Sequence, residues 1–137
     1  MTTTLANRFA NSKLVVYWLN DNKKELVEKC ANKSFSECSE QANKQKVHLK
    51  LIVDDYIDWL LFSLNTGIPI NLNEVSIKLL PLTKKYIIAF QALMEEVNLS
   101  QMSEECKHEV QPYIRFLISW LETLKVIDET NEIVLPL

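Results

Sequence analysis

Three aspartates close together are the strongest candidates for chemistry in this sequence. Residues 54 to 58 read DDYID, which places Asp54, Asp55 and Asp58 in the pattern D-D-x-x-D. Asp54 and Asp58 stand four positions apart, so they would project from one side of a helix, one turn apart. Carboxylates so placed can coordinate Mg²⁺ when a diphosphate supplies the remaining oxygen ligands. The alternative is that they keep one face of a helix hydrated.

The DDYID pattern resembles the aspartate-rich motif of prenyl and terpene synthases over these five residues. That resemblance implies a large helical cavity and a second metal-binding motif on a facing helix. A chain of 137 residues is too short for such a cavity, and no second motif of this kind occurs in it. We therefore expect neither a metal nor another cofactor, and we interpret the aspartates as part of a solvated helix face.

The same helix face carries apolar residues as well as aspartates. At about 100° per residue, Leu51, Leu61 and Phe62 fall within or beside the acidic arc, opposite the apolar arc that would face the core. An acidic face with apolar residues suits a partner helix or tail that brings Lys or Arg beside its own hydrophobic residues. The alternative is that another helix of this chain covers the face. The predicted partner-binding residues are Leu51, Asp54, Asp55, Asp58, Leu61 and Phe62.

Other patterns that could support catalysis are incomplete. Glu105-x-x-His108 has the spacing that di-iron bundles use on two of their four helices, but it occurs once, because Gln45 stands three positions before His48. Cys106 and His108 would lie about 200° apart on a helix and cannot act together as nucleophile and base. With a single Gly the chain has no glycine-rich phosphate loop. We expect no catalytic residues and no enzymatic activity.

Apolar residues at spacings of three and four predict four main helical regions. The first spans about residues 5–30, with a break near residues 20–22, and the second spans about residues 34–65. Ser34-x-x-Glu37 predicts a capping box that opens the second helix, and Gly67 with Pro69 predicts its end.

Two proline residues predict interruptions in the later helical regions. The third region begins near residue 73 and is disturbed at Pro81, and the fourth begins at Ser103 as N-cap and is interrupted at Pro112. Two short β-type runs in residues 126–135 predict a small hairpin at the C-terminus. The prediction is therefore an all-α protein, a helical bundle of four to five segments in one domain over residues 1–137, with a short C-terminal β-hairpin as an addition.

Composition restricts the partners and the compartment. The hydrophobic fraction is 47%, the charged fraction is 24% and the net charge is −3, which disfavours nonspecific binding to nucleic acid. No run is apolar and long enough to span a bilayer, and the first residues do not read as a signal peptide. Three cysteines without a C-x-x-C pattern indicate a reducing compartment, with Cys30 and Cys38 as small buried hydrophobes. We expect a cytoplasmic protein.

These observations favour a non-enzymatic protein–protein interaction module, an adaptor or assembly chaperone that binds a helix or an apolar, basic tail of a partner. A homo-oligomer formed through the same face is a further possibility. The alternative is a regulator that binds nucleic acid, because a helix followed by a hairpin resembles a winged-helix end. Glu129 and Glu132 would lie in that wing and repel phosphate, which counts against it. A metal-dependent hydrolase or transferase would depend on DDYID and Glu105-x-x-His108 alone.

Overall fold

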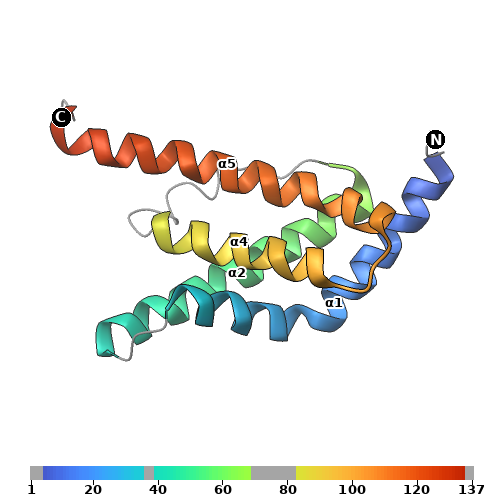
Figure 1. The fold of residues 1–137 in the computed structure, drawn as a ribbon, viewed down its shortest axis with the longest axis horizontal. Helices are drawn as coiled ribbons and strands as arrows, with labels where there is room; N and C mark the ends of the chain where they lie inside the picture. The colour runs from blue at the N-terminus through green and yellow to red at the C-terminus, as the bar shows by residue number, and fades with distance from the viewer. Residues whose placement is uncertain (1–4, 36–38, 69–82, 135–137) are drawn as a thin grey trace.

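The described residues of the chain fold as a bundle of four helices. The computed structural model describes residues 5–35, 39–68 and 83–134, and within these ranges it contains no strand. The helices are α1 (Leu5–Ser34), α2 (Glu40–Thr66), α4 (Thr83–Leu99) and α5 (Glu104–Val134). α1 packs mainly against α2, and α4 packs mainly against α5; the first turns of α1 and the last turns of α5 lie at opposite ends of the molecule (Figure 1). The predicted all-α bundle is confirmed.

The core forms where the apolar faces of all four helices meet. Tyr56 of α2 is one of the largest fully buried side chains, and its ring packs edge-on against Phe90 of α4 with 4.9 Å between ring centroids. The Tyr56 hydroxyl donates a hydrogen bond of 3.0 Å to the Tyr113 carbonyl of α5. One side chain thus connects three helices. Burial of a side chain such as Leu60 or Leu117 stabilises the fold by about 1.5–3 kcal/mol.

Serine and glycine set the bounds of α2 and the start of α5. The Ser39 hydroxyl accepts a hydrogen bond of 3.0 Å from the Ala42 amide, so Ser39 is the N-cap of α2. Gly67 ends α2 with φ of 75°, and its amide donates to the Ser63 carbonyl at 2.8 Å. Ser103 accepts from the Cys106 amide at 3.2 Å. The predicted roles of Gly67 and Ser103 are confirmed.

The predicted capping box at Ser34 is wrong, because Ser34 is the last residue of α1. Its hydroxyl donates a hydrogen bond of 2.6 Å to the Lys85 carbonyl, and the Lys85 ammonium donates one of 3.1 Å to the Ser34 carbonyl. This reciprocal pair connects the end of α1 to the start of α4, and Ser39 caps α2 instead. Glu37, the other half of the predicted box, lies outside the described residues.

The predicted breaks in α1 and α5 do not occur. At residues 20–22 α1 continues, and the Asn22 side-chain amide donates to the Trp18 carbonyl at 2.8 Å within the helix. Pro112 lies inside α5 and has no N–H to donate to the His108 carbonyl, four residues earlier in the helix. Both residues are exposed, so water can hydrate that carbonyl instead. Buried Val110 and Ile114 hold α5 against the core on either side. Pro81 lies outside the described residues.

The predicted C-terminal hairpin is also wrong, because residues 126–134 continue α5 as helix. The prediction depended on the β-strand propensity of Val and Ile residues in this segment, and that propensity depends strongly on the surroundings of each residue. An isolated pair of short strands is marginal in water, whereas a continuing helix satisfies its backbone hydrogen bonds locally. The winged-helix alternative loses the element on which it depended. Residues 135–137 lie outside the described residues.

Candidate functional site

The predicted partner-binding residues lie together on one side of α2, and all except Leu61 point away from the core. With Val47, which the sequence reading missed, they fall within about 120° of the helix circumference at 100° per residue. Leu51 and Val47 are each 60% exposed, and Phe62 is 52% exposed, whereas Leu61 is half-buried against the core. We call this surface the α2 outer face. It consists of Val47, Leu51, Asp54, Asp55, Asp58, Leu61 and Phe62.

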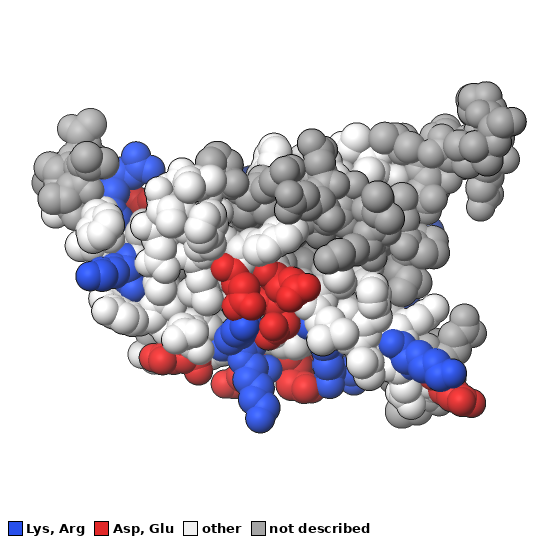
Figure 2. Space-filling model, turned by 180° about the vertical axis from the view of Figure 1, so that it is seen from behind, with Lys and Arg blue, Asp and Glu red and all other residues white. Residues whose placement is uncertain are grey.

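The α2 outer face has an acidic centre between two apolar ends. Asp54 is half-buried, Asp55 and Asp58 are exposed, and one carboxylate oxygen of each lies within 4.8 Å of the others. Figure 2 shows the side of the molecule opposite to Figure 1, where acidic side chains gather in a compact group with basic side chains directly beside it. Leu51 precedes this centre along the helix and Phe62 follows it. A polypeptide segment that lies along this face would therefore contact an apolar, then an acidic, then a second apolar surface.

Lys23 of α1 neutralises part of the acidic centre. Its ammonium lies 2.5 Å from a carboxylate oxygen of Asp58 and 3.3 Å from one of Asp54. The hydrogen bond to Asp58 is the main cause that raises the pKa of Lys23, although partial burial opposes it. One ammonium among three carboxylates leaves two negative charges. Asp55 makes no ion pair or hydrogen bond with the other described residues, so its carboxylate faces water.

The three carboxylates are close enough together to bind one cation, as the metal hypothesis requires. The carboxylates of Asp54 and Asp58, however, already bind the Lys23 ammonium. This ammonium supplies the positive charge that a metal ion would otherwise bring to them. No other group of three acidic, His or Cys side chains gathers closely enough to bind a metal in the part of the chain that the structure describes. The face lies on the surface, not in an enclosed cavity. This geometry supports the interpretation of a solvated helix face.

The other pattern considered for metal or nucleophilic chemistry is divided between two sides of α5. Glu105 and His108 are exposed, whereas Cys106 is buried and its thiol lies 3.8 Å from the Asn11 side-chain oxygen. Cys106 and His108 therefore point in different directions, as their spacing predicted. Cys30 is also buried, and burial raises the pKa of its thiol to about 12. Cys38 lies outside the described residues.

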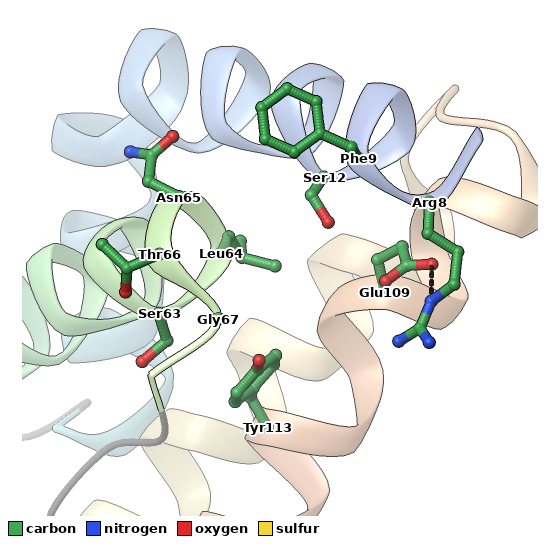
Figure 3. Close-up of a pocket in the computed structure, with 10 residues that line it drawn as sticks. All are labelled: Arg8, Phe9, Ser12, Ser63, Leu64, Asn65, Thr66, Gly67, Glu109 and Tyr113. Atoms are coloured by element: carbon green, nitrogen blue, oxygen red, sulfur yellow. Dashed lines mark hydrogen bonds and ion pairs between the residues drawn. The ribbon is translucent and has the colours of Figure 1, made fainter. Parts of the chain in front are cut away.

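A cleft that the sequence reading missed lies where the start of α1, the end of α2 and the first half of α5 meet. It has a volume of about 380 Å³, and Figure 3 shows Phe9, Leu64 and Tyr113 around it, with Arg8 and Glu109 paired at one side. The two atoms of that ion pair are 3.4 Å apart. None of the ten lining residues is His, Cys or Lys, and the one carboxylate among them, that of Glu109, is paired with Arg8. Arg8 and Glu109 stand 101 positions apart, and no local sequence signal connects them.

No protein-family model, curated protein or solved structure matches this chain. Across the described ranges, none of the helices combines the length and apolarity needed to cross a membrane. A proposal about function must therefore come from the geometry of the chain itself.

Proposed function

We propose that this protein is a non-enzymatic interaction module, an adaptor or assembly chaperone, that binds a partner protein through the α2 outer face. The partner segment is a helix or an extended tail with Lys or Arg beside hydrophobic residues. Its apolar side chains would bury Leu51 and Phe62, and its cations would approach Asp55 and Asp58. The observation that carries this proposal is the order apolar, acidic, apolar on a helix face that the rest of the described chain leaves open.

Charge and apolar contact have separate roles in such an interface. Removal of apolar area from water supplies about 25 cal/mol per Å² before the costs of association, so the exposed ends of the face are its source of affinity. Acidic groups at the centre favour partners with positive charge, accelerate their encounter and disfavour acidic competitors. The remaining two negative charges at the acidic centre suit this second role.

Affinity capture from the source cell tests the proposal. The bait is compared with Asp55→Arg, which reverses one charge at the aspartate that has no ion pair with Lys23, and with Leu51→Asp, which removes an apolar end. We expect one dominant protein to be retained by the unchanged bait and lost with both variants, because each variant removes one kind of contact.

A matched control distinguishes this surface from a general effect of charge. Glu95→Arg changes the net charge by the same amount as Asp55→Arg, and Glu95 is an exposed residue of a different helix, α4. The control should retain the captured protein. Equal capture by Asp55→Arg and by the unchanged bait would contradict the proposal.

A further inference from the structure

We infer that the partner segment is an amphipathic α-helix with two hydrophobic residues eleven positions apart and Lys or Arg at the fifth and eighth positions of that twelve-residue segment. This inference depends on the proposed function and specifies its partner. It follows from four residues of the α2 outer face: Leu51, Asp55, Asp58 and Phe62 are separated by steps of four, three and four.

These steps match a second helix better than an extended tail. The three steps cover eleven residues and average about 3.7, close to the 3.6 residues of one helical turn, so two α-helices can keep these four positions in contact over this length. At about 1.5 Å per residue, Leu51 and Phe62 are about 16 Å apart along the axis, and a helical partner spans that distance in the same eleven residues. An extended chain presents side chains to one side about every 6.7 Å. If one such side chain lay opposite Leu51, the third one after it would lie about 3.5 Å beyond Phe62.

Charge specifies the two central positions of the partner helix. Asp55 faces water without an ion pair among the described residues, and Asp58 shares Lys23 with Asp54. Two negative charges therefore remain for the partner, and two cations would balance them. The order of steps reads the same in both directions, so parallel and antiparallel partner helices would carry the same pattern.

The occupant is a different protein rather than a second copy of this chain. A matching helix needs two Lys or Arg residues three positions apart, between hydrophobic residues. No two of the 15 Lys and Arg residues in this sequence stand three positions apart. A second copy therefore cannot supply the required pattern of charge from one of its helices.

A synthetic peptide tests the inference directly. The probe is a capped helical peptide of about 18 residues with Leu, Lys, Arg and Leu at the four positions and Ala, Gln and Glu elsewhere. The control peptide has the same composition, but its two cations are moved by two positions, about 200° around the helix. Fluorescence anisotropy should show that the probe binds at least about tenfold more tightly than the control, and that added salt weakens this preference.

A charge exchange separates recognition from misfolding. A peptide with Glu at both central positions should bind the Asp55→Lys, Asp58→Lys double variant at least about tenfold more tightly than it binds the unchanged protein. If the double variant does not fold by circular dichroism, Asp55→Lys alone is tested with peptides in which either cation is replaced by Glu. Recovery of binding shows that the variant is folded and that charge is recognised at these positions.

The possible failures have different consequences. Equal binding of the probe and the control, or no recovery in the charge exchange, overturns the helical pattern. If captured protein still depends on Asp55 while only a short extended basic peptide binds, the proposed function stands and the helix is excluded. Self-association of the chain that Asp55→Lys abolishes would overturn the choice of a different protein. If neither capture nor any peptide depends on Asp55 or Leu51, both proposals fall.

Discussion

At the scale of single residues, Cys30 shows how burial changes the chemistry of a reactive group. Its side chain is fully buried in α1, and desolvation, assisted by the nearby charge of Glu96, raises the pKa of the thiol from 9.0 to about 12. A thiol that stays protonated is a poor nucleophile. Cys30 therefore acts as a small apolar residue, and we expect it to react slowly with alkylating reagents while the protein is folded.

The raised pKa of Cys30 predicts a loss of stability at alkaline pH. Below about pH 9 the thiol is protonated in both the folded and the unfolded chain, so it contributes no pH dependence. Between about pH 9 and about pH 12 the unfolded chain loses this proton and the folded chain keeps it. The free energy of unfolding should then fall with rising pH, by at most about 1.4 kcal/mol per unit from this group.

Urea unfolding of the unchanged protein and of Cys30→Ala at about pH 8 and about pH 10.5 measures this contribution. The variant should be less stable at the lower pH, because it loses buried volume, but its stability should decline less steeply. Parallel declines in the two proteins would show that Cys30 does not ionise on unfolding. The Tyr86 hydroxyl, whose pKa burial raises to about 12, adds the same trend to both proteins.

At the scale of one element, the end of α2 depends on a backbone conformation more than on contacts. Gly67 has φ of 75°, and a Cβ placed there would meet nothing within 4 Å. Gly67→Ala should therefore destabilise the protein through the left-handed backbone alone, by about 1–2 kcal/mol. Gly67→Asn should cost less, because Asn adopts this conformation more readily. Thermal unfolding of both variants tests the prediction, and equal losses for Ala and Asn would contradict it.

The same helix shows which sequence signals were sufficient for its ends. Gly67 acts within one turn of the chain, so its role could be predicted from neighbouring residues. Ser34 and Ser39 both offer a hydroxyl ahead of α2, and only the structure shows which one caps it. Ser34 instead bonds to Lys85, 51 positions away, and a local rule cannot anticipate such a partner.

At the scale of the whole molecule, α2 has a buried side that packs in the core and an exposed side that we propose as the binding surface. Leu60 is fully buried and Leu51 is 60% exposed. Replacing each of these leucines by Ala therefore tests whether the two sides of the helix differ in their contribution to stability. Leu60→Ala should lower the free energy of unfolding by about 2–5 kcal/mol, because it leaves a cavity. Leu51→Ala should change it by less than about 0.5 kcal/mol. Denaturant unfolding measures both values.

The binding measurements complete that comparison. Leu51→Ala should weaken binding of the helical peptide while it leaves the unfolding midpoint nearly unchanged. A loss of stability at Leu51 as large as that at Leu60 would mean that the α2 outer face belongs to the core, and the proposed function would lose its surface.

The sequence by itself determined the fold class and the composition of the α2 outer face. Both depend on the helical period, which places residues three and four apart on one side whatever surrounds the helix. Val47 lies four positions before Leu51 and about 40° from it around the helix, so the same period also predicts its place on this face. The expected hairpin was wrong because Val and Ile preferences are weak beside the local hydrogen bonding of a helix that is already formed.

Only the tertiary structure decided how much of this face stays open and how its charge is balanced. Lys23 reaches Asp58 across 35 positions, and Arg8 meets Glu109 across 101. Such contacts depend on the packing of one helix against another, and helix packing follows from core side chains distributed over the whole chain. The helical period specifies which residues share a side of a helix, but the assembled bundle determines which of those sides meet water.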